Sequence, residues 1–178
     1  MKHSTVWKEA KIDTNNALTF YLSRTVTRLD ELQKMELNNE VDIVAYILVV
    51  GEPFISGQRF GKPIKIQTLL VIDNSGQLAQ IEIKNISSIY ADLFKPKNIL
   101  ILLNLQYRAY DPKYGIYMLS TCDDTEIKRS PREEYTRQAK ENLENWIKNN
   151  YDLVKKCETT AIKLLFQSTV IKASTFFT

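Results

Sequence analysis

The chain has 178 residues, and its 44% hydrophobic and 25% charged content is that of a globular domain able to build a core. The formal net charge of +3 is compatible with an anionic partner without requiring one. Cys122 and Cys157 fit no metal-site spacing and His3 is the only histidine, which argues against catalytic triads and zinc sites. No stretch has the character of a signal peptide or a membrane span. We therefore expect an intracellular protein with no cofactor, no metal, no enzymatic activity, no membrane contact and no small-molecule substrate.

The first half of the chain predicts strands separated by short turns. Residues 17–23 alternate well enough for an edge strand that ends an N-terminal extension over 1–23. Residues 27–35 favour a short helix or turn with Thr27 as N-cap. Residues 40–51 are a long β-branched run and form the best strand candidate.

Glycine and proline residues mark the turns and loops between the next predicted strands. Residues 52–63 hold two glycines and two prolines, which predicts a loop. Strands are expected over 64–73 and 77–85, joined by a hairpin turn at Asn74-Ser75-Gly76. Residues 86–94 place apolar side chains at helical spacing, so one or two helical turns should follow.

Two further strands complete a barrel. Residues 98–110 and 116–127 read as a hairpin around a turn at 111–115. Three strands, a short helix and two strands are the connectivity of the oligonucleotide-binding (OB) barrel, which has five strands. The predicted fold class is therefore mainly β with α: an OB barrel over residues 24–129, with a short helix between its third and fourth strands and a helix after it.

The segment after the barrel predicts a helix over 130–156. Ser130 is the expected N-cap, Pro131 fits the first helical position and Glu133 completes a capping box. An apolar stripe follows, and it can pack on the barrel itself or on a partner helix; its candidate partner-binding residues are Tyr135, Leu143, Trp146 and Ile147, with Trp146 favoured as a packing anchor. The apolar tail over 157–178 fits either a strand on another surface or a loose end.

Three stretches resemble a known family. They are SRTVTRLDELQKMELNNEVDIVAYI, VIDNSGQLAQIEI and MLSTCDDTEIKRSP with the later AKENLENWI. Over about residues 22–148 their order resembles the second DNA-binding domain of the replication protein A large subunit, a family that includes telomere- and telomerase-specialised relatives. The resemblance implies a nuclear, non-enzymatic binding module, and it leaves open whether the module holds DNA or protein.

The expected floor of the barrel departs from that family. If Ile81 and Ile83 face the core, then Gln80, Glu82 and Lys84 face outward, and Lys65 and Gln67 are expected on the same side. The family usually has an aromatic residue at the place of Lys84. A base–aromatic stack is worth about 1–3 kcal/mol, so its loss should weaken DNA binding by roughly tenfold to a hundredfold.

The flanking loops favour nucleic acid. Cations stand beside aromatic rings there, as a groove for single strands requires. Tyr107 and Tyr117 have the higher chance of being structural, since they lie inside strands. The candidate nucleic-acid-binding residues are Arg59, Phe60, Lys62, Lys65, Lys84, Tyr107, Arg108, Tyr110, Lys113 and Tyr114.

Two hypotheses follow. The first is a nuclear, replication-protein-A-like subunit that binds single-stranded DNA, with telomeric strands as one candidate, inside a larger assembly. The alternative is a protein-docking OB adaptor of a telomerase, telomere or replication complex that binds little DNA itself. The expected partners are single-stranded DNA and other subunits of such a complex.

Overall fold

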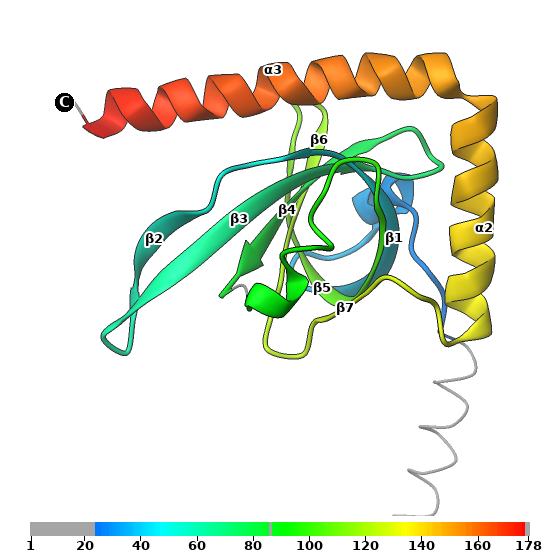
Figure 1. The fold of residues 1–178 in the computed structure, drawn as a ribbon, viewed down its shortest axis with the longest axis horizontal. Helices are drawn as coiled ribbons and strands as arrows, with labels where there is room; N and C mark the ends of the chain where they lie inside the picture. Colours follow the sequence, from blue (N-terminus) through cyan, green and yellow to red (C-terminus); the bar gives the residue numbers. More distant parts are fainter. Residues whose placement is uncertain (1–23, 86, 177–178) are drawn as a thin grey trace, which may run out of the picture.

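The structure is a computed structural model that describes residues 24–85 and 87–176. The extension and edge strand predicted within 1–23 lie outside the described residues. The described part is mainly β, with two helices at its C-terminal end (Figure 1). The strands are β1 (Glu40–Val50), β2 (Phe54–Arg59), β3 (Lys62–Ile72), β4 (Leu78–Lys84), β5 (Ile99–Asp111), β6 (Ile116–Ser120) and β7 (Glu126–Lys128).

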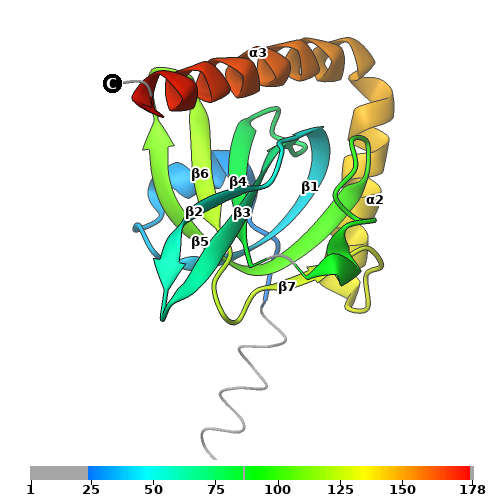
Figure 2. The same cartoon turned by 60° about the vertical axis from the view of Figure 1, so that its left-hand side comes forward.

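Five of these strands close into a barrel. The hydrogen-bonded order is β1-β3-β4-β6-β5, and β5 pairs again with β1 to complete the ring (Figure 2). All these pairs are antiparallel except β4 with β6, which run parallel. The predicted five-stranded OB barrel is therefore confirmed. β2 adds to β3, and β7 adds to β5.

The segment predicted as a loop over 52–63 is instead largely strand. β2 and the start of β3 form a hairpin that extends beyond the barrel (Figure 1). Its turn is Phe60-Gly61, and both residues have positive φ, 53° and 74°. A two-residue turn with two positive φ values matches the twist of a hairpin. A bulky Phe at such a position is uncommon, so the usual hairpin signature is absent from the sequence.

Two 3₁₀ helices complete the barrel. η1 (Leu29–Lys34) buries Leu29 and Leu32 fully in the barrel core. Its N-cap is Arg28 rather than the predicted Thr27, and the Glu31 carboxylate accepts the Arg28 backbone N–H at 3.1 Å. η2 (Ser88–Tyr90) lies between β4 and β5, where a short helix was predicted.

Two helices, α2 (Glu134–Asn149) and α3 (Tyr151–Phe176), follow the barrel and run in different directions along it (Figure 1). α2 begins after an N-cap at Glu133, so the predicted start at Ser130 and Pro131 is wrong. The prediction of a strand or a loose end for the tail is also wrong, because residues 157–176 are helical. No helix in the described residues is long and apolar enough to cross a bilayer.

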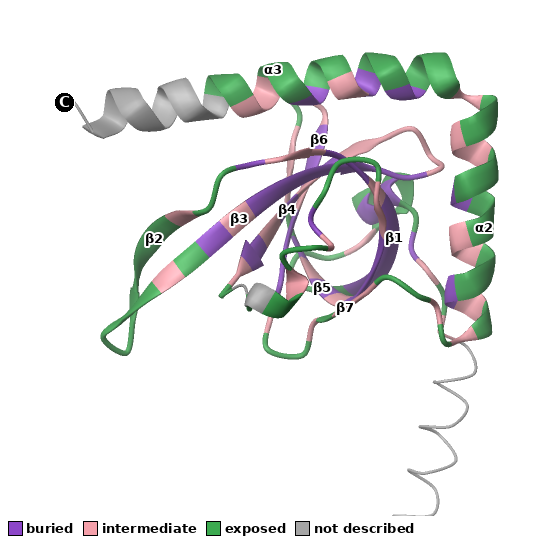
Figure 3. Ribbon diagram, viewed as in Figure 1, coloured by how far each residue is buried: buried purple, intermediate pink, exposed green. Residues whose placement is uncertain are grey.

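The inward faces of both helices pack on the outside of the barrel, whereas their outward faces are exposed (Figure 3). Leu143 is 2% exposed against Val44 of β1 and Ile101 of β5. α3 places Val154, Cys157 and Ala161 on β1 and β3, and burial raises the pKa of the Cys157 thiol.

The apolar stripe of α2 is therefore occupied by the chain's own barrel. Trp146 and Ile147 join the clusters under both helices, and Tyr135 donates its hydroxyl proton to Asp42 at 3.2 Å. Leu143 is buried by this packing, while Tyr135, Trp146 and Ile147 are only partly buried, and partner binding by these four residues stays a prediction. The alternative that the stripe packs on the barrel is confirmed.

Asp42 is a buried carboxylate with partners from three other segments. Arg24 donates to its Oδ1 at 2.7 Å, and the backbone N–H of Asn104 donates to the same oxygen at 3.0 Å. Tyr135 supplies the third contact from α2. Burial, followed by the charge of Asp42, raises the pKa of Tyr135 far above its usual range.

Leu143→Ala should lower the free energy of unfolding by about 2–5 kcal/mol, because it removes a buried side chain between α2 and the barrel. Urea denaturation followed by circular dichroism measures this change. Ile162→Ala on α3 is the control, since Ile162 is 53% exposed and should change stability by less than about 0.5 kcal/mol. Equal effects of the two substitutions would contradict the packing of α2.

Candidate nucleic-acid interface

A groove crosses the outer face of β4, β6 and β5 and consists of three adjoining hollows. The first, of about 230 Å³, lies beside α3, and the second, of about 160 Å³, is centred on the barrel wall. The third, of about 420 Å³, reaches Arg59 on the β2–β3 hairpin. Gln80 lines the first two hollows, while Lys84 and Arg108 line the second and third. The shared residues make the groove continuous from α3 to the hairpin.

The floor of the groove follows strand alternation on β4. Ile81 and Ile83 are 0% and 2% exposed in the core, as predicted. Gln80, Glu82 and Lys84 all line the second hollow.

On β3, the predicted alignment with this floor is wrong by one residue. Ile66 is paired with Lys84, and Gln67 with Ile83. Paired residues share a face and neighbours alternate, so Lys65 and Gln67 lie on the face opposite to Lys84. Lys65 is exposed but does not line the groove.

Arg108 is turned into the groove by a β-bulge. The register of β5 against β6 shifts between Tyr107, which opposes Leu119, and Ala109, which opposes Met118. The extra residue of a bulge points a side chain where regular alternation would not. Arg108 thereby lines the second and third hollows, and its Nη1 donates to the Asn38 side-chain oxygen at 2.8 Å.

Tyr107 is a core residue and Tyr110 packs, half-buried, against the core; neither lines the three hollows. Tyr107 is 4% exposed, and burial raises its pKa. The Tyr110 ring packs against Tyr117 with 4.7 Å between ring centroids. Burial makes Tyr107 inaccessible to a ligand, whereas nucleic-acid contact by the half-buried Tyr110 stays a prediction.

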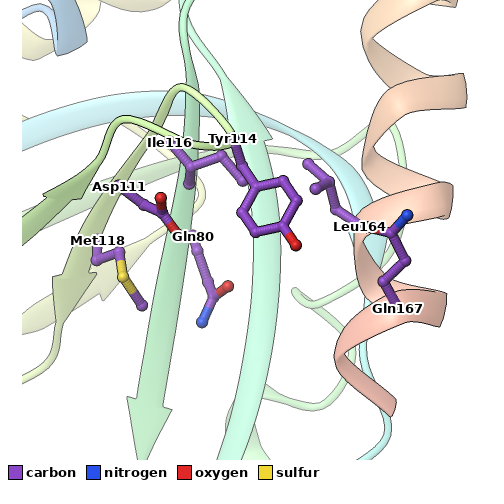
Figure 4. A pocket seen from close by; sticks show the side chains of 7 residues that line it. All are labelled: Gln80, Asp111, Tyr114, Ile116, Met118, Leu164 and Gln167. Atoms are coloured by element: carbon purple, nitrogen blue, oxygen red, sulfur yellow. The ribbon is translucent and has the colours of Figure 1, made fainter. Parts of the chain in front are cut away.

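An aromatic side chain lines one end of the groove, and another is exposed on the hairpin beyond its other end. Tyr114 comes from the β5–β6 turn, and its ring lies 5.0 Å from the Nζ of the neighbouring Lys113 (Figure 4). At the other end, Phe60 is 92% exposed at the hairpin tip, with the Arg59 guanidinium 5.5 Å from its ring. Lys62 is exposed on the same hairpin.

The charges along the groove are mixed. Arg59, Lys84 and Arg108 supply the cations of its central and hairpin-side hollows, and Glu82 and Asp123 supply acids. Within the described residues, no group of three or more metal-ligating side chains could hold an ion. Asp111 adds a third acid in the first hollow, so the part of the groove suited to phosphates lies where Arg59, Lys84 and Arg108 meet, in the second and third hollows.

Sequence reasoning missed part of the groove. Met118 and Ser120 line the groove because β6 pairs in parallel with β4, and no local sequence pattern predicts this pairing. Leu164 and Gln167 enter from α3, where the sequence analysis left the structure open. The alternation of β4 predicted Gln80 on the floor, although Gln80 was not among the candidate binding residues.

The model of one protein family matches residues 24–167 of the chain; its description is BRCA2, oligonucleotide/oligosaccharide-binding, domain 3. No curated protein sequence matches the chain significantly.

Solved structures share the fold at low sequence identity. A replication protein A heterotrimer bound to ssDNA matches with a TM-score of 0.57 and 16% identity over 72% of this chain, which spans 29% of that chain. DNA-binding domain A of S. cerevisiae replication protein A matches with a TM-score of 0.50 and 15% identity, over 63% of this chain and 99% of that one. A replication factor A related protein from Methanobacterium thermoautotrophicum matches with a TM-score of 0.50 and 12% identity, over 63% of this chain and 96% of that one.

Tyr107→Ala should cost about 3–5 kcal/mol of unfolding free energy, because it empties a buried aromatic site. Phe60→Ala should change stability by less than about 0.5 kcal/mol, since the Phe60 ring is exposed. Chemical denaturation of both variants measures the difference. A larger loss for Phe60→Ala than for Tyr107→Ala would contradict these placements.

Proposed function

Since the chain belongs to the family of BRCA2 oligonucleotide/oligosaccharide-binding domain 3, we propose that it binds single-stranded DNA as a non-catalytic subunit of a larger assembly. The observation that carries the proposal is the continuous groove from the β2–β3 hairpin to α3, into which Arg59, Lys84 and Arg108 project. The ssDNA in the replication protein A structure of the same fold supports the choice of ligand.

The cations of the groove bind the phosphates of the strand. Arg59 comes from the hairpin, Lys84 from β4 and Arg108 from the bulge of β5, so three separate elements converge on one path. The contact between Arg108 and Asn38 holds the guanidinium over the groove before a ligand arrives. Neutralising phosphates releases counterions, which makes the affinity depend on salt.

The aromatic side chains at the two ends of the groove bind bases. Phe60 presents an exposed ring beside Arg59, and Tyr114 presents one beside Lys113. Between them the second hollow has no aromatic side chain, and Glu82 repels phosphates there. We therefore assign the groove a moderate affinity, below that of a floor with stacking rings.

The resemblance to replication protein A and its specialised relatives supports a nuclear location. We place the chain in a replication or telomere assembly, with telomeric single strands among the candidate ligands.

A second candidate function is the protein-docking adaptor of a replication, telomere or telomerase complex. The observation in its favour is on α3, where Ile162 and Phe166 are 53% and 71% exposed and lie one helical turn apart. These two side chains, and not the buried stripe of α2, would contact the partner subunit.

Binding to a labelled strand of about 20 nucleotides tests the DNA proposal by fluorescence anisotropy. With three phosphates neutralised, affinity should fall by about tenfold to twentyfold between about 50 and 200 mM salt. Lys84→Ala and Arg108→Ala should each weaken binding several-fold and reduce the salt slope by about 0.7.

Exposed cations of α2 provide matched controls for this experiment. Lys148→Ala and Arg137→Ala remove the same charges outside the groove, so they should leave the affinity nearly unchanged. No binding at low salt, or equal losses for Lys84→Ala and Lys148→Ala, would refute the proposal.

The adaptor candidate predicts that the chain captures a replication or telomerase subunit in a pull-down. Ile162→Ser combined with Phe166→Ser should abolish capture, because it removes the exposed apolar contacts, and should leave strand binding intact. Undiminished capture by this double variant would exclude α3 as the docking surface.

A further inference from the structure

The first hollow of the groove is an open corner between the barrel and α3, which we call the corner pocket. Gln80 and Met118 form its barrel side, Leu164 and Gln167 form its helix side, and the Tyr114 ring lies between them (Figure 4). Asp111 and Ile116 line it at the base of the β5–β6 turn.

The size of the corner pocket limits its occupant. Its volume of about 230 Å³ lies below the roughly 300–1,000 Å³ typical of sites for small-molecule ligands and cofactors. A single flat ring system fits this volume better than a complete cofactor does. The pocket also opens onto the rest of the groove at Gln80, so the occupant can be part of a longer chain.

The walls have the chemistry of a base site. Tyr114 offers an aromatic face, and Met118 and Leu164 offer apolar contacts for the faces of a ring. The polar groups are few: the Asp111 carboxylate and the Gln80 amide on the barrel side, and the Gln167 amide on the helix side. Flat apolar walls with a small polar set favour a planar heterocycle with polar edges.

The Asp111 carboxylate determines which hydrogen-bonding edge of a base fits the pocket. Its Oδ1 accepts the backbone N–H of Lys113 at 2.9 Å, which fixes the carboxylate within the turn. A carboxylate accepts hydrogen bonds and donates none, so it selects an edge that carries donors. Guanine presents two adjacent donors, N1–H and the 2-amino group, on one edge. Thymine presents carbonyl oxygens on either side of a single N–H and would place them against the carboxylate.

We infer that the corner pocket binds one base of the bound strand and prefers guanine, with adenine and cytosine next and thymine last. This inference rests on the proposed function and deepens it, because it gives the groove a base preference. α3 is then part of the recognition site as well as a packing element, since Leu164 and Gln167 form its outer wall.

Two measurements on the full chain test the inference. In the first, ¹H–¹⁵N NMR follows titration with each deoxynucleoside monophosphate, and dGMP should shift the signals of Tyr114 and Gln80 at lower concentration than the thymidine nucleotide does. In the second, anisotropy compares strands of about 20 thymines with and without one guanine. The guanine should raise affinity by about fivefold to a hundredfold.

Variants locate the preference in the pocket. Asp111→Asn keeps an oxygen for the Lys113 N–H but adds a donor, so the preference for guanine should fall to about twofold or less. Leu164→Trp should fill the pocket and abolish the preference, while binding of the thymine strand persists through the groove cations. Asp123→Asn, an acid of the third hollow, is the matched control and should keep the preference.

The outcomes separate this inference from the proposed function. Strand binding with no base preference, or the same loss of preference in Asp111→Asn and Asp123→Asn, overturns the inference and leaves the groove proposal standing. Shifts at Tyr114 with dGMP but no strand binding support the pocket and refute the groove proposal. If dGMP causes no NMR shifts and the strand does not bind, the inference and the proposed function are both overturned.

Discussion

Closure of the barrel depends on how the backbone N–H and C=O groups find hydrogen-bond partners where β1 pairs with β5. The register of this pair shifts between Val41 and Ile43, and Asn104 has a positive φ of 57° on the facing strand. Such an irregularity leaves backbone groups without ladder partners, and buried unpaired groups are costly. The Asp42 carboxylate accepts the Asn104 N–H, and the Thr125 hydroxyl donates to the Asn104 carbonyl at 2.8 Å. A single buried acid thus permits the strand to bend and the ring to close.

The same carboxylate orders the segments around the barrel. A buried charge is tolerated only where it is paired and hydrogen-bonded, and Arg24 and Tyr135 complete that environment. These partners bring the chain before η1 and the start of α2 to the same place. α2 is thereby directed along β1 and β5, and the corner at Asn150 then turns α3 across the barrel (Figure 1). α3, which contributes to the end of the groove, is then held there by its own packing on β1 and β3.

The sequence predicted the barrel because alternation and turn chemistry are local. β4 alternates cleanly about Ile81, and the Asp73 carboxylate accepts the Ser75 N–H at 3.0 Å in the predicted hairpin turn. α3 was not predicted because threonines at 159 and 160 are weak helix formers, and burial of residues such as Ala161 on the barrel outweighs that preference. The candidate site was predicted in part: Arg59 lines the groove, but Tyr110 does not. The bulge at Arg108, which inverts the direction of the next side chains, depends on pairing between strands and has no signature along one of them.

The position of α3 has a thermodynamic consequence. One face of the helix packs on β1 and β3, and Leu164 and Gln167 contribute to the end of the groove. Ligand binding and packing of α3 on the barrel are therefore thermodynamically linked. A ligand that touches α3 stabilises the packed state of the helix, and the packed helix strengthens ligand binding by the same free energy. Allosteric control of the groove would need no movement of the barrel, because any factor that loosens or tightens the helix alters ligand binding.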